Sequence, residues 1–253
     1  MIPAGYVLLV VFAFSLGTVD ASFGMGYGTL LAPMLLLAGF DPLQVVPAVL
    51  ISQLAGDFLA AFFHHRIENV DFSIGSKHLK VALTLAILGL TSSVIAVLVA
   101  VSLPSHYLSL YIGLSTATLG VFIIAARSKS FGFSWVKILL LGGLASFNKG
   151  LTGGGYGPII TVGQILTGID AKAAIGITAL AEGVTCSVAA LSFFFFRQNT
   201  DWLLPLLLSI GVAISSPVAA LIVRKVDSKF MKSAIGVSTF VVGLVTLMKV
   251  FQF

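Results

Sequence analysis

The chain has 253 residues, of which 58% are hydrophobic and only 9% are charged, and its formal net charge is +5. A soluble domain carries about a quarter of its residues charged, so this composition excludes an ordinary water-soluble protein and predicts one that lies in lipid. The basic residues are spread over short segments between apolar runs, which excludes the clustered basic face of a nucleic-acid-binding protein. The single cysteine, Cys186, excludes an intramolecular disulfide and a cysteine-based metal cluster, and we interpret it as a small residue in a packed helix.

Ten apolar segments follow one another along the chain, and they predict an all-α polytopic membrane protein. The first segment resembles a secretory signal, but no Lys or Arg precedes it, so we interpret it as a retained membrane element. The first and second segments, and the sixth and seventh, form pairs of shorter segments separated by Gly-rich breaks. The expected segments cover residues 3–22, 24–40, 43–63, 77–101, 105–126, 135–150, 153–168, 171–196, 202–223 and 230–251.

An internal repeat relates the two halves of the chain. A shift of 129 positions aligns Gly24–Gly28 with Gly153–Gly157, and it also brings Asp41 onto Asp170. Two later blocks recur in the same order, Asn-x-Asp at 69–71 and 199–201, and Ile-Gly-x-Ser-Thr at 112–116 and 235–239. Ordered blocks along both halves predict a duplication, with a first membrane repeat over residues 1–127 and a second over residues 128–253, which together form one transport domain.

The basic residues predict that the second repeat is inverted relative to the first. Each half has five apolar elements, an odd number, so the second half starts on the opposite side of the membrane. Loops after odd-numbered elements hold most of the basic residues and should face the cytoplasm of a bacterium, within its inner membrane, so that both termini lie outside. The sequence leaves open whether the short Gly-broken segments cross the bilayer or are re-entrant. The basic residues on the cytoplasmic side would be Arg66, Lys77, Lys80, Arg127, Lys129, Lys137, Lys172, Arg224, Lys225, Lys229 and Lys232, and those on the other side Lys149, Arg197 and Lys249.

The two Gly-rich breaks predict the substrate site. Glycine permits a tight break and a close approach to the backbone, and the helix that follows directs N–H groups and its positive dipole end at an anion. Inverted repeats with broken segments at matching positions are typical of transporters whose site lies near the bilayer midplane. The alternative is that these small residues serve close helix packing. The residues expected to bind substrate are Gly24, Gly26, Tyr27, Gly28, Gln53, Asn148, Lys149, Thr152, Gly153, Gly154, Gly155, Tyr156, Gly157 and Gln164, with Ser22 as a further neutral donor.

Ionisable residues within the apolar segments are the other candidates for function. Lys149 and Asp20 occupy repeat-equivalent positions just before the breaks, and Lys149 either attracts an anion, pairs with Asp20 or extends to the interface. Glu182, which aligns with Gln53, is the first candidate to carry a coupling proton, and Asp57 and Asp20 follow it. Hydrogen bonding between helices is the alternative role for these carboxylates. We expect no metal and no cofactor.

Two further motifs have structural interpretations. Asp41 before Pro42, and Asp170 before Ala171, should be helix N-caps. The run of residues 64–66, His-His-Arg, follows the third segment and should be a basic anchor at the cytoplasmic interface rather than a metal site.

The residues around the breaks resemble the sulfite exporter TauE/SafE family of membrane transporters. The resemblance rests on the stretch Gly24–Pro33, on the Gly-Phe-Asp-Pro turn at 39–42 and on the second copy from Gly153 to Asp170, and it covers essentially the whole chain. It implies transport of a small anion such as sulfite, sulfoacetate or another organosulfonate. One departure is that Pro33 aligns with Val162, so the two copies of the motif differ.

These features together predict a secondary transporter that works by alternating access and is not an enzyme. The partners would be a small anionic substrate, the lipid bilayer and a coupling proton or cation, with homodimerisation left open. A passive anion channel is one alternative, and a membrane subunit or scaffold without transport of its own is another, although short loops leave little surface for docking. The apolar segments show no set of acid, base and metal-binding residues suited to catalysis.

Overall fold

The fold is all-helical, as the sequence predicts. The computed structural model describes residues 4–126, 132–197, 202–222 and 228–251, and within them the chain forms helices and no strand. The ten expected segments correspond to ten helices in this part of the chain. Their bounds are α1 (Ala4–Phe23), α2 (Tyr27–Leu37), α3 (Pro42–Arg66), α4 (Lys77–Ser102), α5 (Ser105–Ala126), α6 (Trp135–Thr152), α7 (Tyr156–Leu166), α8 (Ala171–Phe196), α9 (Leu203–Ile222) and α10 (Ser228–Phe251).

The second and seventh helices start three residues later than expected, at Tyr27 and Tyr156. The residues before them include glycines with positive φ, +67° at Gly24, +131° at Gly26, +74° at Gly153 and +81° at Gly155. Such angles lie outside the right-handed helix and are accessible mainly to glycine. The Gly-rich segments are therefore true interruptions between two helices, which is what the sequence predicts of them.

The aspartates before α3 and α8 cap these helices. The Asp41 side chain accepts a hydrogen bond from Leu43 N at 2.8 Å, and Asp170 accepts one from Lys172 N at 3.0 Å. These bonds satisfy backbone N–H groups that have no partner within the helix. Both N-cap predictions are confirmed.

Most of the long helices could each span a bilayer, whereas α2 and α7 could not. Six of the described helices, α1, α3, α4, α5, α8 and α9, are long and apolar enough to cross. Helices α2 and α7 have 11 residues each, which gives a length of about 16 Å against a hydrocarbon core of about 30 Å. The chain is a multi-pass membrane protein in which two short helices begin inside the molecule.

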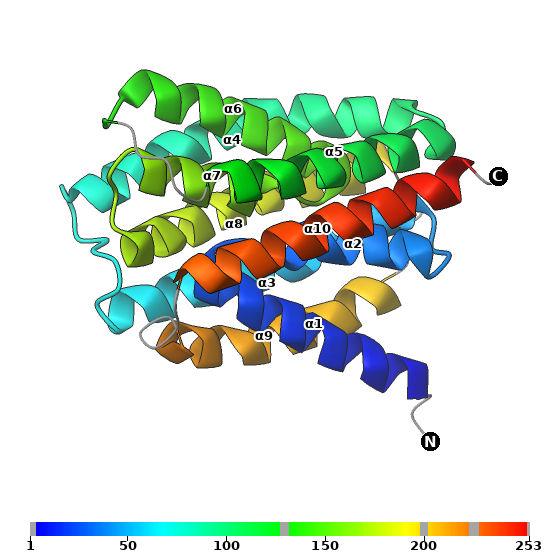
Figure 1. Ribbon diagram of the computed structural model, residues 1–253, viewed down its shortest axis with the longest axis horizontal. Coiled ribbons are helices and arrows are strands. Elements are labelled where there is room, and N and C mark those ends of the chain that lie inside the picture. The colour runs from blue at the N-terminus through cyan, green and yellow to red at the C-terminus, as the bar shows by residue number, and fades with distance from the viewer. Residues whose placement is uncertain (1–3, 127–131, 198–201, 223–227, 252–253) are drawn as a thin grey trace.

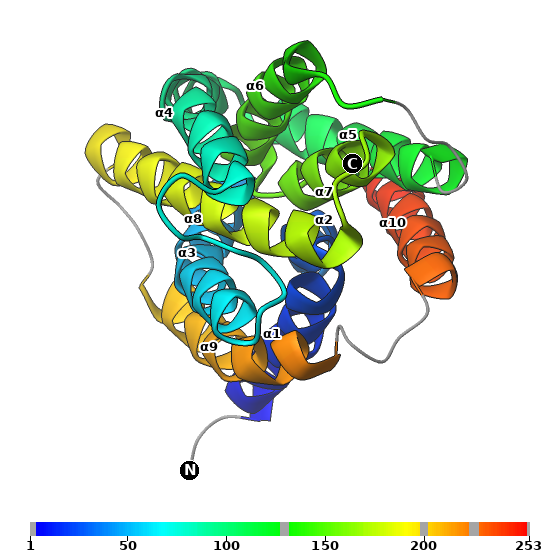
Figure 2. The same cartoon turned by 90° about the vertical axis from the view of Figure 1, so that its left-hand side faces the viewer.

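The helices run along the long axis of the molecule, so their connections gather at two ends (Figures 1 and 2). Helices α3, α5, α7 and α9 finish at the left of Figure 1, and α4, α6, α8 and α10 start there. We call this the basic end, because the helix termini there carry Arg66, Lys77, Lys80, Lys137 and Lys172. The N-terminus, the C-terminus and the α4–α5 connection lie at the opposite end. Helix α2 returns to the end at which α1 starts, and α7 returns to the end at which α6 starts.

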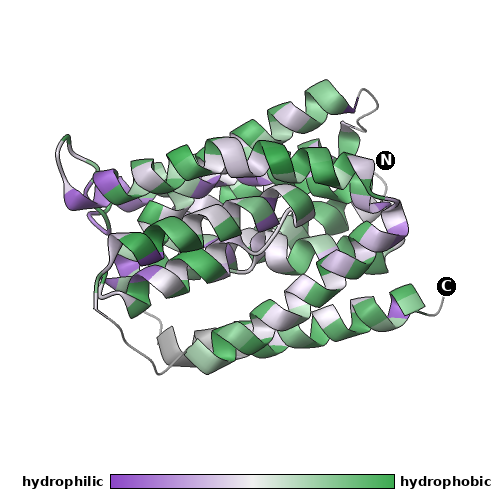
Figure 3. Ribbon diagram, turned by 90° about the horizontal axis from the view of Figure 1, so that it is seen from above, coloured by the Kyte–Doolittle hydropathy of each residue, from purple (hydrophilic) through white to green (hydrophobic). Residues whose placement is uncertain are grey.

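Helices of the first half pack mainly on helices of the second half. Helix α1 lies along α9 and α6 lies along α4, while α3 contacts α8 and α9, and α8 contacts α3 and α4. Helices α5 and α10 form a further pair. The outward-facing surface is largely apolar and the hydrophilic residues concentrate at one end (Figure 3), with Leu8, Leu140 and Phe195 among the exposed side chains. This surface suits contact with lipid, and the starts of α2 and α7 are enclosed at the centre.

Candidate substrate and coupling site

The two Gly-rich breaks contact each other in the middle of the molecule. The Thr161 hydroxyl on α7 donates to the carbonyl oxygen of Gly24 at 2.8 Å, and the N–H of Gly155 donates to the hydroxyl of Thr29 on α2 at 3.0 Å. Each break is therefore bonded to a threonine in the short helix that belongs to the other half. The structure thus brings together Gly24–Gly28 and Gly153–Gly157, as the sequence predicts.

Several of the glycines are required by this contact. A Cβ atom at Gly28 would overlap the carbonyl oxygen of Gly153, and one at Gly157 would lie 2.5 Å from the carbonyl oxygen of Gly24. Gly154 would likewise place a Cβ 2.6 Å from the carbonyl oxygen of Gly28. Real Cβ atoms do not approach oxygen so closely, so these positions need glycine for backbone-to-backbone packing. The packing interpretation accounts for Gly28, Gly154 and Gly157, and a direct role of these residues in substrate binding stays a prediction.

Lys149 lies at the centre of a buried polar layer. Its side chain is fully buried, and its ammonium contacts Glu182 Oε1 at 2.8 Å and donates to Gln53 Oε1. The amide of Gln53 donates to the same Glu182 oxygen at 2.8 Å. Lys149 therefore does not extend to the membrane interface, and its ion-pair partner is Glu182 rather than Asp20.

Asp20 instead caps the short helix α2. Its Oδ1 accepts from the N–H of Tyr27 at 3.1 Å, and its Oδ2 accepts from Gln53 Nε2 at 3.3 Å. A carboxylate at a helix N-terminus is stabilised by the free N–H groups and the helix dipole. Helix α7 has no equivalent carboxylate, because Lys149 stands at the position that corresponds to Asp20. The two repeat-equivalent helix starts are thus electrostatically different.

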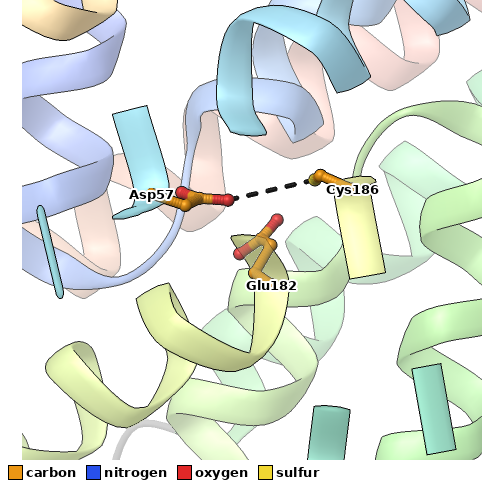
Figure 4. Close-up of side chains that lie close together, drawn as sticks. All are labelled: Asp57, Glu182 and Cys186. Carbon is orange, nitrogen blue, oxygen red and sulfur yellow. Dashed lines mark hydrogen bonds between the residues drawn. The ribbon is translucent and has the colours of Figure 1, made fainter. Parts of the chain in front are cut away.

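The polar layer is built from repeat-equivalent pairs that are each 129 positions apart: Asp20 and Lys149, Gln53 and Glu182, and Asp57 and Cys186. Two of these pairs are in contact, Gln53 with Glu182 by a hydrogen bond and Cys186 Sγ with Asp57 Oδ2 at 3.9 Å (Figure 4). The sequence analysis did not assign Cys186 to the site. The signal that could have found it is its distance of 129 positions from Asp57.

The layer carries more acidic than basic side chains. Lys149 is its one cation, against the three carboxyl groups of Asp20, Asp57 and Glu182. Asp57 is only 5% exposed, and the polar groups beside it include the weak thiol of Cys186 and the side-chain amide of Gln53. An unpartnered charge in such surroundings is costly, so this layer suits a proton or a small cation better than an anion in direct contact. Asp57, Glu182 and Cys186 also lie close enough together to hold a metal ion, but the ammonium of Lys149 at Glu182 opposes one.

Two small hollows flank the contact between the breaks. The first, which we call the carboxylate hollow, has a free volume of about 10 Å³; it is lined by Asp20, Ala21, Gly24, Asp57, Ala60, Ile175, Thr178, Ala179 and Glu182. The second, which we call the threonine hollow, is closed to water in the state that the structure shows; it is lined by Gly28, Thr29, Ala32, Pro33, Ile112, Ser115, Thr116, Leu119, Asn148, Thr152, Gly154 and Gly155. All three carboxyl groups of the polar layer line the first hollow, and the second is lined by neutral groups alone.

The threonine hollow is rich in neutral hydrogen-bonding groups. Asn148 Nδ2 donates to the carbonyl oxygen of Gly154 at 2.9 Å, and its Oδ1 accepts from the Tyr111 hydroxyl at 3.2 Å. The Thr152 hydroxyl donates to the carbonyl oxygen of Asn148 at 2.8 Å. Thr116 is 4% exposed, and its hydroxyl has no hydrogen-bond partner in the part of the chain that the structure describes. The hollow therefore offers hydroxyl and amide groups and at least one unused donor.

The repeat-equivalent region in the other half is less polar. Asn148 corresponds to Val19, Thr152 to Phe23, and Thr29 to Pro158. Val19 and Phe23 pack in an apolar cluster with Met25, Val162 and Ile235. Hydroxyl groups remain there at Thr239, which corresponds to Thr116, and at Thr161, which corresponds to Ala32. Asn148, Thr152 and Thr29 thus have no polar counterpart in the other half. This difference extends the asymmetry between Pro33 and Val162 that the sequence shows.

Three predicted residues lie away from the polar layer. Gln164 donates to the Thr178 hydroxyl at 2.9 Å and so fastens α7 to α8. Ser22 donates to the carbonyl oxygen of Ala219 on α9 at 3.4 Å. The prediction of an interfacial anchor is wrong for His64, which is fully buried and lies 2.8 Å from the carbonyl oxygen of Ala21, because the α3–α4 connection folds over it.

Comparisons with known proteins agree with this architecture. The family model described as sulfite exporter TauE/SafE matches residues 9–246. The chain is also 25% identical to a protein of Bacillus subtilis (strain 168) described as "Probable membrane transporter protein YtnM", over 94% of this chain and 82% of that protein.

Proposed function

The chain belongs to the sulfite exporter TauE/SafE family of membrane transporters, and from this premise we propose that it carries a small anion, such as sulfite or an organosulfonate, by alternating access. Membership of this family establishes that the protein is a membrane transporter. The substrate, the coupling and the transport cycle are the parts that we propose. They are supported by the chemistry of the hollows and by the packing of helices of one half on helices of the other.

We propose that the anion binds in the threonine hollow once this hollow widens during the transport cycle. The observation that carries this proposal is that Thr29, Asn148 and Thr152 line this hollow, whereas Pro158, Val19 and Phe23 stand at the repeat-equivalent positions. An oxyanion needs several hydrogen-bond donors and no carboxylate. Thr116 offers an unused hydroxyl, and Asn148 and Thr152 can turn toward the anion the donors that now bond within the protein. The uncapped start of α7 adds the positive end of a helix dipole beside Gly155.

We propose further that the two halves are inverted repeats that rock about this centre. When the halves are exchanged, the pairing of α1 with α9 becomes that of α6 with α4, and the pairs α3–α8 and α5–α10 map onto themselves. Such a packing pattern supports a two-fold relation. The α1–α2 and α6–α7 pairs would be re-entrant hairpins that enter from opposite faces, and the basic end would face the cytoplasm.

The carboxyl groups beside Lys149 are the proposed carriers of the coupling ion. Glu182, Asp57 and Asp20 all line the carboxylate hollow, which is separate from the threonine hollow. Protonation of a buried carboxyl group removes the cost of an unpartnered charge. A proton is therefore the coupling ion that this hollow supports best.

Uptake into proteoliposomes tests the anion site. We expect Thr116→Val and Asn148→Leu each to lower the uptake of labelled sulfite or sulfoacetate by about tenfold or more, since a hydrogen bond to a charged group contributes about 1.5–3 kcal/mol. Thr118→Val is the matched control, because this threonine faces outward on the same helix and its hydroxyl donates to Leu114 O. Uptake that is unchanged in Thr116→Val and Asn148→Leu would exclude the threonine hollow as the site.

The same preparation separates a transporter from a channel. A coupled transporter accumulates the anion above its external concentration when a proton gradient is imposed, whereas a channel only equilibrates it. We expect accumulation that a proton ionophore abolishes. Equilibration without accumulation under every gradient would favour the channel.

A further inference from the structure

Lys149 can neutralise one negative charge, and Glu182 already uses it. The ammonium and Glu182 Oε1 are 2.8 Å apart, and both side chains are almost completely buried. Gln53 locks the pair by accepting from Lys149 and donating to the same oxygen. In the state that the structure shows, the positive charge of Lys149 is therefore fully engaged within the protein.

An incoming anion would disturb this balance. The threonine hollow is lined by Asn148, the neighbour of Lys149 in α6, and by Gly28, at which a Cβ atom would lie 3.0 Å from Gln53 Oε1, the oxygen that accepts from Lys149. Charges interact strongly over such distances where water is excluded, because the effective dielectric constant is low. An anion in the hollow and an ionised Glu182 would both need the single positive charge of Lys149. One of the two negative charges would therefore stay unneutralised.

We propose that binding of one substrate anion is accompanied by uptake of one proton on Glu182, so that Lys149 neutralises the anion instead of the glutamate. The inference rests on the proposed function and adds to it the residue that links the anion to the proton. Protonated Glu182 still accepts the hydrogen bond from Gln53 at Oε1, so this contact is kept when the negative charge of Glu182 is removed. The proton binds at Oε2, which has no donor among the described residues.

The proton can reach Glu182 through the carboxylate hollow. Glu182, Asp57 and Asp20 line this hollow together, and the Asp57 carboxyl group lies within 4.8 Å of that of Glu182. The hollow lies between α1, α3 and α8, and its lining residues Ala60 and Ile175 are nearer the basic end than Asp57 and Glu182 are along α3 and α8. Asp57 is therefore placed to pass the proton on, while Glu182 is placed to couple it to the anion.

Other titratable groups around Glu182 are less suited to be the linked site. Asp20 is fixed as the cap of α2, and Cys186 lies one turn after Glu182 on α8, with its thiol beside Asp57. Tyr27 and Tyr156 are buried phenols that carry no charge at neutral pH. On α4, which packs on α8, the titratable residues Lys77, His78 and Lys80 all lie in or next to the first turn, at the basic end. The titratable groups around Glu182 on other helices are thus Asp20, Asp57, Lys149, Tyr27 and Tyr156.

Binding measurements at several pH values test the proposal. The probes are methanesulfonate and ethanesulfonate, which each carry one constant negative charge between about pH 5.5 and 8.5, and the protein is the full chain in detergent. For the native chain we expect Kd to rise toward about tenfold per pH unit at the alkaline end of this range, the slope for one linked proton. In Glu182→Gln the side chain mimics the protonated acid, so Kd should be independent of pH and at least about tenfold lower than that of the native chain at the alkaline end.

Glu68→Gln is the matched control, because it removes an exposed carboxyl group on the α3–α4 connection, outside the hollow, and should leave the pH slope in place. If Glu182→Gln does not fold, proton uptake by the native chain is measured directly in a weakly buffered solution. The protein should take up one proton from this solution for each anion that it binds. A Kd that does not change with pH in the native chain overturns the proposal, and so does a slope that persists in Glu182→Gln. Absence of anion binding at every pH would overturn the proposed function itself, together with this inference.

Discussion

At the residue scale, residues at equivalent positions of the two halves are in contact at the centre of the molecule, and they differ in chemistry. Positions that are equivalent in the two halves meet at the centre, as Gln53 and Glu182 do. Two identical carboxylates in such a contact would repel each other, and two lysines would as well. The chain places an amide opposite a carboxylate, and a thiol opposite Asp57. The difference between the two halves at these positions thus avoids contact between like charges.

The ion pair of Lys149 leads to a prediction about stability. Lys149→Met leaves the Glu182 carboxylate buried without its cation, so we expect a loss of about 3–5 kcal/mol in the free energy of unfolding. The double variant Lys149→Met with Glu182→Gln should lose clearly less, because no unpaired charge is then buried. Thermal unfolding in detergent, followed for the two single variants and the double variant, measures the difference. Equal losses in Lys149→Met and in the double variant would show that the pair is not coupled.

At the element scale, the position of α2 and α7 depends on the breaks that precede them. These helices are too short to cross the bilayer, and each is held at its start by the break of the other half through Gly24, Thr29, Gly155 and Thr161. Backbone contact at this point requires positions without a side chain. The glycines therefore fix how closely the two halves can approach.

Substitution of the contact glycines tests this packing. In Gly28→Ala and Gly157→Ala the new methyl group would overlap the backbone of the opposite break, so the breaks must separate, and we expect a loss of about 1–3 kcal/mol in stability together with loss of transport. Gly143→Ala in α6 is the control, since a Cβ there meets only the Ser92 hydroxyl at 3.9 Å, and it should be neutral or slightly stabilising. Melting temperature and uptake are the measurements. Full activity of Gly28→Ala would show that the breaks do not need this contact.

At the scale of the whole molecule, the distribution of basic residues defines the proposed orientation in the membrane. The helix ends at the basic end carry Arg66, Lys77 and Lys172 among others, whereas the N-terminus and the start of α5 lie at the opposite end. Cytoplasmic loops of membrane proteins are enriched in Lys and Arg. The basic end should therefore face the cytoplasm.

Thiol labelling checks this orientation. In a Cys186→Ala background, Ile74→Cys places a thiol on the α3–α4 connection, where Ile74 is 100% exposed, and His106→Cys places one at the start of α5 at the opposite end. A membrane-impermeant maleimide added to intact cells should label His106→Cys, and it should label Ile74→Cys only after the membrane is opened. The reverse pattern would mean that the basic end faces outward.

The sequence by itself determined the helical membrane class, the approximate helix bounds, the caps at Asp41 and Asp170, and the set of buried polar residues from which the polar layer is built. These features depend on local chemistry, such as apolar runs, turn residues and charges in an apolar context, which a linear pattern contains. The internal repeat also related Lys149 to Asp20 and Glu182 to Gln53.

Only the tertiary structure decided which of these residues meet. It paired Lys149 with Glu182 rather than with Asp20, placed Gln164 between α7 and α8, buried His64, and assigned Gly28 and Gly157 to contact between the breaks. It also separated a neutral hollow from an acidic one. The physical reason is that such pairings depend on the rotation and depth of helices more than a hundred residues apart, which are set by packing across the two halves and not by the local pattern of either one.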